Sequence, residues 1–514
     1  MDQDTILVFD FGGQYCHLIG RRIRENNVYS EIVRHDISLK ELNDLKKKLN
    51  IKGIILSGGP ASIYEKNAPR MERNIVELNI PILGICYGHQ LIAYYLNGGV
   101  KRAKKKEFGQ SFASIDKTDG ILRGLEKREQ IWMSHGDTVF KLPKEFEVLA
   151  HTSNCPVAAF KHKQKQIYGI QWHPEVAHTE KGEVVLRNFI FDICKARSNW
   201  NVNDLTRASI TEITKEVGDG RAIIALSGGV DSSTTLVLAS KALGRNLTAV
   251  FVDHGFMREG EPEQIKVIAK RLKINLVVVD ARKRFLKRLK GITDPEEKRH
   301  IIGKEFINVF EETARKIKAD YLIQGTIYPD RIESGKSKMA NVIKTHHNVG
   351  GLPDRIKFKG LIEPLKELYK DEVRKLALQL GLPESIVARQ PFPGPGLAVR
   401  IIGEVTEEKL KIAKEADSIV VEELTRADLI ELLWQYFAVL TNTMSAGVKG
   451  DARSYGYVVA VRAVQSREAM TANFADIPHD VLEKISTRIT NEIAEVVRVV
   501  YDITNKPPST IEWE

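Results

Sequence analysis

Short apolar runs, most of them followed by a glycine turn, recur along the chain and limit its possible folds more than any other feature. An early series of these runs is residues 6–10, 54–56 and 82–85. A later series is residues 222–226, 248–252, 276–279 and 321–323. Runs that are apolar throughout and lead into helix-like stretches are typical of parallel strands covered by helices. The sequence therefore predicts an α/β architecture that is built twice in succession.

Two interruptions divide this pattern. The chain has 514 residues, which is enough for about three domains. Polar residues 197–201 break the pattern first, and the three prolines of segment 391–396 exclude a helix or a central strand there. Beyond the prolines we expect a small α+β unit with helices at 407–426 and 481–496 and a strand at 455–464. The expected domains are residues 4–196, 197–390 and 391–514.

Bulk composition is that of a soluble globular protein. Hydrophobic residues make up 43% and charged residues 28% of the chain, and no apolar run is long enough for a membrane span. The first four residues carry acids and no basic segment of the kind that begins a secretory signal. The four cysteines are widely spaced, which fits a reducing compartment better than a disulfide framework or a zinc site. We therefore expect a cytoplasmic protein without a membrane partner.

The net charge of +10 has two possible meanings. A basic protein can bind nucleic acid, or it can hold small anionic ligands on an otherwise mixed surface. Basic residues here are interleaved with acids along the chain, and the densest cluster, residues 101–106, contains no aromatic side chain. We therefore expect small anionic ligands and no nucleic acid, with residues 101–106 in a solvated hairpin or loop.

Cys86 lies in the frame of a nucleophile elbow. It follows the strand-like residues 82–85 and precedes a helix start, with Gly84 and Gly88 on either side. Small residues at these positions permit the sharp strand-to-helix turn that presents a nucleophile, and the positive end of a helix lowers the pKa of a thiol. A lone cysteine is more often a buried apolar residue, so the surrounding frame is what favours catalysis.

A base and its orienting group follow later in the chain. His173 ends a strand-like run, and Glu175 lies two residues on, where it can hold the imidazole in one tautomer. Cys86, His173 and Glu175 thus form a candidate triad of nucleophile, base and orienter. The turn at residues 57–60 ends another strand, and its N–H groups can form an oxyanion hole with that of Tyr87.

Residues 84–90 and 172–175 resemble the class I, or triad, glutamine amidotransferases, and the resemblance covers about residues 4–195. It implies a flavodoxin-like domain in which Cys86 attacks the side-chain amide of glutamine, while His173 moves the proton and Glu175 orients His173. Ammonia leaves, and water hydrolyses the glutamyl thioester. The further positions implied are Gly59 and Tyr87 for the oxyanion hole, and Gln90, Ser134 and His135 for the bound glutamine.

A second chemical motif occupies residues 227–233, which read Ser-Gly-Gly-Val-Asp-Ser-Ser between a strand and a helix. A glycine-rich loop at a helix N-terminus offers N–H donors and a positive dipole to phosphate groups. The three serines add hydroxyl donors, and the loop is not a Walker A sequence. Asp231 would repel phosphate unless it also holds Mg²⁺.

In this strand–loop–helix context the motif resembles the N-type ATP pyrophosphatases, which have the adenine nucleotide alpha hydrolase-like fold. The resemblance implies that the loop grips the β,γ-pyrophosphate of ATP. The implied ATP-binding residues are Ser227, Gly228, Gly229, Val230, Asp231, Ser232 and Ser233. Asp253 ends the next strand and is expected at the carboxyl edge of the sheet, where ligands bind in doubly wound folds. Asp231 is the candidate Mg²⁺ ligand, and no tightly bound organic cofactor is expected.

Further segments resemble the glutamine-hydrolysing GMP synthetase family nearly end to end. They are residues 324–330, 343–348, 389–396 and 500–514. The resemblance implies glutamine, ATP and XMP as substrates, an adenylyl-XMP intermediate that ammonia converts to GMP, and a homodimer formed through the C-terminal domain. The XMP-binding positions that it implies are Gly394, Lys506, Ile511 and Glu512. Lys344 and Lys366 are candidates to offset phosphate charge, although Lys366 is equally compatible with a plain surface position.

Two other functions compete with this one. A related PP-loop enzyme that amidates or thiolates tRNA would suit the net charge, but the sequence has no Cys-x-x-Cys pair and no added RNA-binding module. A non-catalytic nucleotide-binding regulator would be expected to have lost at least one site residue, and none is lost. The adjacent His346 and His347 are not expected to bind a metal, because neighbouring side chains on a strand point to opposite faces.

Overall fold

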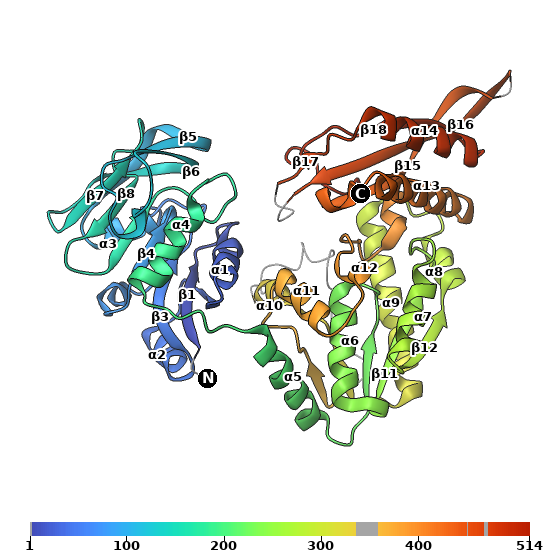
Figure 1. Ribbon diagram of the computed structural model, residues 1–514, viewed down its shortest axis with the longest axis horizontal. Coiled ribbons are helices and arrows are strands. Elements are labelled where there is room, and N and C mark those ends of the chain that lie inside the picture. The colour runs from blue at the N-terminus through green and yellow to red at the C-terminus, as the bar shows by residue number, and fades with distance from the viewer. Residues whose placement is uncertain (1–2, 336–357, 450, 467–470) are drawn as a thin grey trace. The chain divides into compact units, whose positions relative to one another are not determined.

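The computed structural model describes residues 3–335, 358–449, 451–466 and 471–514. The chain forms two compact units, Met1–Asn201 and Val202–Glu514 (Figure 1). No helix among the described residues is long and apolar enough to cross a membrane. Both units contain parallel strands joined through helices, and the predicted α/β class is confirmed.

The first unit is built on a sheet of nine strands in the order β2-β1-β3-β4-β9-β8-β7-β5-β6. The strands are β1 (Asp4–Asp10), β2 (Tyr29–Arg34), β3 (Asn50–Leu56), β4 (Ile82–Ile85), β5 (Gly99–Ile115), β6 (Arg128–Lys141), β7 (Phe146–His151), β8 (Ala159–His162) and β9 (Ile167–Ile170). The helices are α1 (Cys16–Glu25), α2 (Leu39–Lys48), α3 (Tyr87–Tyr95) and α4 (Gly182–Arg187). All seven residues of β1 are buried, as expected for a parallel strand covered on both faces.

Only part of this sheet is parallel. Strands β2, β1, β3, β4 and β9 run parallel, whereas β8, β7, β5 and β6 extend the sheet by antiparallel pairing. The basic residues 101–106 lie within β5, which pairs with β6 as a long hairpin. The apolar-run pattern did not indicate this antiparallel half, because its exposed strands alternate in burial instead of being apolar throughout.

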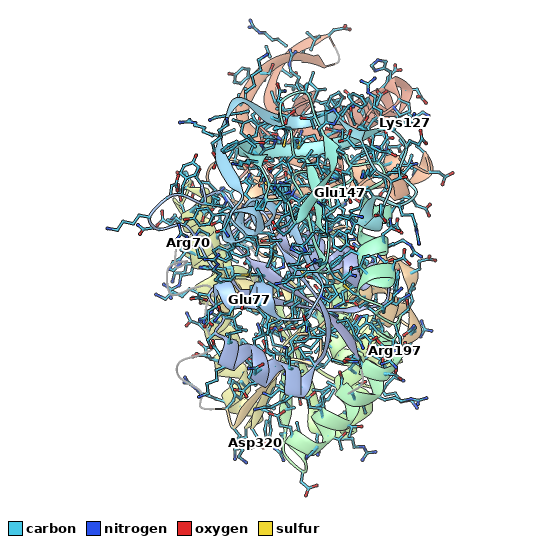
Figure 2. All side chains as sticks on the ribbon, turned by 90° about the vertical axis from the view of Figure 1, so that its left-hand side faces the viewer. Arg70, Glu77, Lys127, Glu147, Arg197 and Asp320 are labelled. Carbon is cyan, nitrogen blue, oxygen red and sulfur yellow. The ribbon has the colours of Figure 1, made fainter. Side chains whose placement is uncertain are left out.

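The last residues of the first unit pack against β1, its first strand. Asp4 is completely buried, and its carboxylate accepts hydrogen bonds from the backbone N–H of Arg197 at 2.8 Å and from its guanidinium at 2.9 Å. Figure 2 labels Arg197 at this position. Asn199 also contacts the strand, since its Oδ1 accepts from the N–H of Asp4 at 3.1 Å. Polar residues 197–201 are therefore tied to the sheet of the first unit.

The second unit contains a parallel sheet with the order β12-β11-β10-β13-β14 within its described residues. Its strands are β10 (Ala222–Ala225), β11 (Leu247–Asp253), β12 (Asn275–Asp280), β13 (Tyr321–Ile323) and β14 (Gly360–Ile362). The accompanying helices are α5 (Val202–Val217), α6 (Val230–Leu243), α7 (Glu261–Arg271), α8 (Arg282–Leu289), α9 (Pro295–Ile317), α10 (Tyr328–Gly335), α11 (Lys370–Gln379) and α12 (Glu384–Val387).

The C-terminal part of the second unit is α+β. Its elements are α13 (Glu407–Arg426), β15 (Gln435–Lys449), β16 (Ala452–Gln465), β17 (Asn473–Phe474), α14 (His479–Glu492) and β18 (Val496–Tyr501). Strands β15 and β17 flank β16 antiparallel, and β18 pairs parallel with β16. Helix α14 ends earlier than the expected residue 496, because the β-branched run that begins at Val496 forms a strand.

One continuous apolar core joins this C-terminal part to the parallel sheet. It includes Val250 of β11, Phe310 of α9, Ile419 of α13 and Val459 of β16, all buried. The proline-containing segment 391–396 therefore lies within one packed unit, with parts of the same core before and after it in the chain.

A buried arginine reinforces this junction. Arg400 is completely buried and donates two hydrogen bonds to the carboxylate of Glu512, at 3.0 and 2.9 Å. Its guanidinium also lies 3.5 Å from Asp417 and 4.0 Å from the ring centre of Phe437. Burial lowers the pKa of Arg400, but the charges of Glu512 and Asp417 outweigh this effect and raise it. The arginine thereby fixes the last residues of the chain against the core.

We expect Arg400→Met to destabilise the second unit by about 3–5 kcal/mol, because the buried Asp417 and the partly buried Glu512 both lose a cationic partner. Arg426→Met is the matched control, since Arg426 is 64% exposed and its ion pairs lie at the surface; it should cost less than about 1 kcal/mol. Chemical denaturation followed by circular dichroism measures both. Equal stability of the two variants would contradict the structural role of Arg400.

Candidate active sites

The nucleophile elbow of the first unit lies between β4 and α3. Cys86 adopts φ 53° and ψ −104°, a left-handed backbone conformation that non-glycine residues rarely hold. A side chain on Gly84 would come within 2.5 Å of the backbone of Gly88, and one on Gly88 within 2.4 Å of the Leu56 carbonyl oxygen. The N–H of Cys86 donates to Ile170 at 2.9 Å, which fixes the turn to β9. The two glycines are therefore steric requirements of the elbow.

His173 and Glu175 follow β9 and face this turn. The Nδ1 of His173 lies 2.7 Å from Oε1 of Glu175, whose side chain is completely buried. The N–H of His173 donates to the Trp132 carbonyl at 3.0 Å, and Arg22 donates to the Glu175 carbonyl at 3.0 Å. Glu175 uses Nδ1 of His173, so the other ring nitrogen, Nε2, is the one that faces the thiol of Cys86.

The electrostatics of this pair favour a charged imidazole. Burial lowers the pKa of His173, but the charges of Glu175 and Cys86, with hydrogen bonds to both, outweigh burial and raise it well above its usual range. An imidazolium beside a thiol stabilises the thiolate, which is the nucleophilic form of cysteine. The arrangement can therefore attack a carbonyl carbon and then protonate the leaving group.

All four cysteines are buried and free of disulfides, so the pairing with His173 is what distinguishes Cys86. Burial raises the pKa of Cys155 to about 11 and raises the pKa of Cys194 strongly. Reactivity toward alkylating agents should therefore be concentrated at Cys86.

Backbone donors line the space beside Cys86. Gly58 lies against both catalytic candidates: a side chain there would come within 3.0 Å of His173 Cε1 and 3.6 Å of Cys86 Cβ. Within the described residues, the N–H groups of Gly59 and Tyr87 make no backbone hydrogen bond. Both predicted oxyanion-hole donors are therefore unused by the backbone.

The predicted glutamine-binding residues also gather at Cys86. The Gln90 amide donates to the Asp137 carbonyl at 3.0 Å and to Oε1 of Gln171 at 3.2 Å. The thiol of Cys86 lies 3.5 Å from the Ser134 carbonyl oxygen, and the Gln171 amide lies 3.6 Å from Sγ. Sequence reasoning missed Gln171, although it precedes Trp172 and His173 in the motif.

We expect Glu175→Gln to lower the pKa of His173, because a neutral amide no longer stabilises the ring's second proton. At pH 7 the imidazolium fraction then falls, and alkylation of Cys86 by iodoacetamide should slow by roughly tenfold. Mass spectrometry of the Cys86 peptide from pH 5 to 9 measures the rate. Glu183→Gln, an exposed carboxylate on α4, is the control. An unchanged pH profile in Glu175→Gln would refute the assigned charge coupling.

The phosphate-loop candidate of the second unit lies between β10 and α6. Gly228 has φ +78°, and a side chain there would come within 2.9 Å of Ile265. The hydroxyls of Ser227 and Ser232 lie 3.0 Å apart, and Ser232 donates to the Gly229 carbonyl at 3.1 Å. These contacts fix the turn before α6, where the first helical N–H groups have no partner within the helix.

Asp231 is the loop residue suited to a cation. One of its carboxylate oxygens lies 2.5 Å from Nζ of Lys370, and the other is buried without a hydrogen-bond partner. No group of three or more metal-ligating side chains occurs in the described part of the chain. A single carboxylate is nevertheless compatible with Mg²⁺, which often takes one or two carboxylates together with substrate phosphates.

Asp253, predicted near the same ligand, ends β11 at the carboxyl edge of the sheet. Its Oδ1 accepts from the Gly255 N–H at 2.9 Å, and Oδ2 lies 3.8 Å from Nε of Arg282. The structure therefore places Asp253 at the expected edge of the sheet, where its carboxylate accepts a hydrogen bond within the turn that follows β11.

Two basic residues at the loop escaped sequence reasoning. Besides Lys370, which lies on Asp231, Arg389 donates to the Gly228 carbonyl at 2.8 Å and forms an ion pair with Glu261. Burial, together with the charge of Arg258, lowers the pKa of Arg389 to about 10. Arg389 begins the motif at 389–396, so its position in that motif was the available signal.

The predicted XMP-binding residues are spread over the C-terminal part. Ile511 is buried in a small apolar cluster, and the carboxylate of Glu512 is occupied by Arg400. The backbone of Lys506 pairs with Ala472, and Gly394 has open space around it. The half-buried Lys366 donates its N–H to the Glu363 carbonyl. Lys344, His346 and His347 lie outside the described residues.

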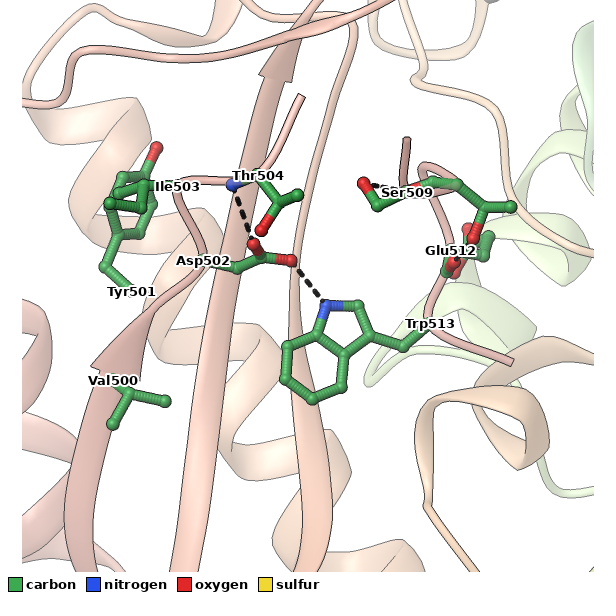
Figure 3. Close-up of a pocket in the computed structure, with 9 residues that line it drawn as sticks. Val500, Tyr501, Asp502, Ile503, Thr504, Ser509, Glu512 and Trp513 are labelled. Atoms are coloured by element: carbon green, nitrogen blue, oxygen red, sulfur yellow. Dashed lines mark hydrogen bonds between the residues drawn. The ribbon is translucent and has the colours of Figure 1, made fainter. Parts of the chain in front are cut away.

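A hollow of about 590 Å³ opens beside β18 and the last residues of the chain (Figure 3). In it, Nε1 of Trp513 donates to Asp502 at 2.8 Å. The lining residues are Val500, Tyr501, Asp502, Ile503, Thr504, Ser509, Thr510, Glu512 and Trp513. This lining contains neither lysine nor arginine, so by itself it offers no cation to a nucleotide phosphate.

Three family models match the chain. They are glutamine amidotransferase class-I over residues 7–193, the PP-loop domain over residues 203–381, and the GMP synthase C terminal domain over residues 422–513. The first match contains the elbow at Cys86, and the second contains the loop at residues 227–233.

Full-length relatives are more than half identical to the chain. A protein named GMP synthase (glutamine-hydrolyzing) from Caldicellulosiruptor saccharolyticus is 54% identical over 516 residues, which covers 100% of both chains. Proteins of the same name from Clostridium tetani and Lactobacillus acidophilus are 52% and 53% identical over 516 residues. These two alignments cover 100% of this chain and 100% and 99% of the relatives.

Proposed function

The chain belongs to the family of glutamine-hydrolysing GMP synthases, and we propose that it converts XMP to GMP with ammonia from glutamine and with ATP cleaved to AMP and pyrophosphate. The observation that supports this most strongly is the presence of both sites on one chain. Cys86, His173 and Glu175 interact in the first unit, and in the second unit residues 227–229 lead into the first turn of α6, which carries residues 230–233.

In the first site, glutamine hydrolysis proceeds through a covalent thioester. The Cys86 thiolate attacks the amide carbon, and the oxyanion forms between the N–H groups of Gly59 and Tyr87. His173, held as an imidazolium by Glu175, gives its proton to the leaving nitrogen, so ammonia departs. The neutral imidazole then takes a proton from water, whose oxygen attacks the thioester and releases glutamate and the thiolate.

In the second site, ATP adenylylates the C2 oxygen of XMP and pyrophosphate leaves. A lactam-type oxygen is a poor leaving group and AMP is a good one, so this activation makes displacement by ammonia possible. The N–H groups and hydroxyls of residues 227–233 hold the departing pyrophosphate. Mg²⁺ held by Asp231 would neutralise phosphate charge, and Lys370 supplies a second cation at the same place.

XMP is proposed to bind near Gly394, Lys506, Ile511 and Glu512. Because the Glu512 carboxylate is engaged by Arg400, main-chain groups at 511–512 are better suited to contact the nucleotide than that side chain. Ammonia is proposed to pass from the first site to the second without release. The overall reaction belongs to de novo guanine nucleotide biosynthesis in the cytoplasm.

A homodimer formed through the C-terminal domain is also proposed. Val448 and Tyr455, on the hairpin of β15 and β16, are 76% and 70% exposed. Large apolar side chains gathered at one exposed place are typical of subunit interfaces. This exposure supports an interface on the hairpin.

The protein is expected to form GMP from XMP, ATP and Mg²⁺ with either glutamine or ammonia as nitrogen source. Cys86→Ala should retain the ammonia-driven reaction and lose the glutamine-driven one, because only the second requires the thioester. Chromatographic detection of GMP, AMP and pyrophosphate checks both statements. Absence of GMP with either nitrogen source in the wild type would exclude the proposed reaction, and loss of both reactions in folded Cys86→Ala would exclude the division between the sites.

Asp231→Asn should abolish synthesis with glutamine and with ammonia alike, by roughly a hundredfold or more, because the amide is a poorer Mg²⁺ ligand and the phosphates lose an organising charge. Asp219→Asn, an exposed carboxylate before β10, is the control. Steady-state rates with saturating XMP provide the comparison. Full ammonia-driven activity in Asp231→Asn would remove this residue from the proposed site.

A further inference from the structure

Glu107 is a buried carboxylate that contacts His135, one of the predicted glutamine-binding residues, and the proposed mechanism does not use it. Glu107 lies on β5 and is 7% exposed. Its oxygens accept from the Thr152 hydroxyl at 3.1 and 3.2 Å and from the Asn154 amide at 3.4 Å, and Nε2 of His135 lies 3.1 Å from Oε2. The carboxylate of Glu107 on β5 therefore binds side chains from both β6 and the loop after β7.

The contacts of His135 fix the position of its ring. Its Nε2 faces the Glu107 carboxylate, and its Nδ1 lies 2.8 Å from the carbonyl oxygen of Asp137. Both ring nitrogens thus face oxygen atoms that can accept hydrogen bonds. His135 and Glu107 form a buried, hydrogen-bonded pair.

The ionised state of Glu107 is consistent with its surroundings. Burial raises the pKa of Glu107, but hydrogen bonds from His135, Asn154 and Thr152, with the charge of His135, outweigh burial and lower it. The carboxylate is therefore charged at neutral pH and depends on these donors in its buried position.

A continuous chain of contacts leads from this pair to the nucleophile. The Asp137 carbonyl that faces His135 also accepts from the Gln90 amide at 3.0 Å. Gln90 in turn donates to Gln171 at 3.2 Å, and the Gln171 amide lies 3.6 Å from Sγ of Cys86. Displacing His135 would therefore displace the groups that surround the reacting thiol.

We propose that Glu107 is a positioning residue for glutamine hydrolysis, which holds His135 and, through the Asp137 carbonyl, sets Gln90 and Gln171 around the bound glutamine. The inference builds on the proposed function of the first site. Glu107 acts on the binding of glutamine through His135 and does not touch the reacting atoms. Loss of its charge weakens the contact with His135 and loosens the segment 134–137.

The test is glutamate release from glutamine by the full chain with saturating XMP, ATP and Mg²⁺. Glu107→Gln should raise the KM for glutamine by roughly ten- to a hundredfold, the range expected for a lost hydrogen bond to a charged group, with a smaller change in kcat. Ammonia-driven GMP formation should be unchanged. Glu129→Gln is the matched control, because Glu129 is also a buried carboxylate of this sheet but pairs with Lys181 and the N–H of Glu126.

A merely structural role gives a different result. Partial unfolding lowers the fraction of active enzyme, which reduces kcat and leaves the KM for glutamine unchanged; that outcome would overturn the proposal. Wild-type KM in Glu107→Gln would also overturn it. A wild-type chain that releases no glutamate at all would instead remove the proposed function of the first site, so the two failures are distinguishable.

A double-mutant cycle tests the route through His135. If Glu107 acts through that ring, Glu107→Gln combined with His135→Gln should raise KM no more than the larger single effect, whereas multiplied effects would refute the route. Should Glu107→Gln fail to fold, Thr152→Val removes the hydroxyl that donates to the same carboxylate and should raise KM by a smaller factor. An unchanged KM in folded Thr152→Val would then count against the proposal.

Discussion

Both candidate sites depend on one constraint of the backbone: the first N–H groups of an α-helix have no partner within that helix. Where a parallel strand leads directly into a helix, these donors and the positive end of the helix meet at the carboxyl edge of the sheet. Between β4 and α3 they lie beside the thiol of Cys86. Between β10 and α6 they lie beside the serines of residues 227–233. The same geometry thus serves an oxyanion in one unit and phosphate groups in the other.

Buried charges then place the side chains that this geometry requires. Glu175 orients His173, Glu107 orients His135, and Arg400 holds the chain terminus at Glu512. A buried ion without a partner is costly, so each pair restricts the position of both side chains and of the backbone that carries them. Order at the sites therefore derives from electrostatics as well as from apolar packing.

The two units contribute unequally to the proposed reaction. The first supplies ammonia, which solution can also supply, whereas the second performs the activation without which ammonia cannot displace the oxygen of XMP. The second unit is also continuously packed. Its parallel sheet and its C-terminal α+β part share one continuous core, and the last residues of the chain are anchored in that core by Arg400 and by the buried Lys298, which pairs with Glu514.

The sequence by itself determined the features that depend on neighbouring residues. The elbow at Cys86 and the loop at residues 227–233 were predictable because the strand, the glycines and the helix start lie within a few positions of one another. Tertiary structure alone decided the rest: the antiparallel half of the first sheet, the contact of Lys370 with Asp231 across 139 positions, and that of Arg389 with Gly228 across 161. Glu107 and His135, 28 positions apart, belong to the same class. The pairing of these groups carries no local pattern, because its free energy arises only when folding brings distant polar and charged groups together away from water.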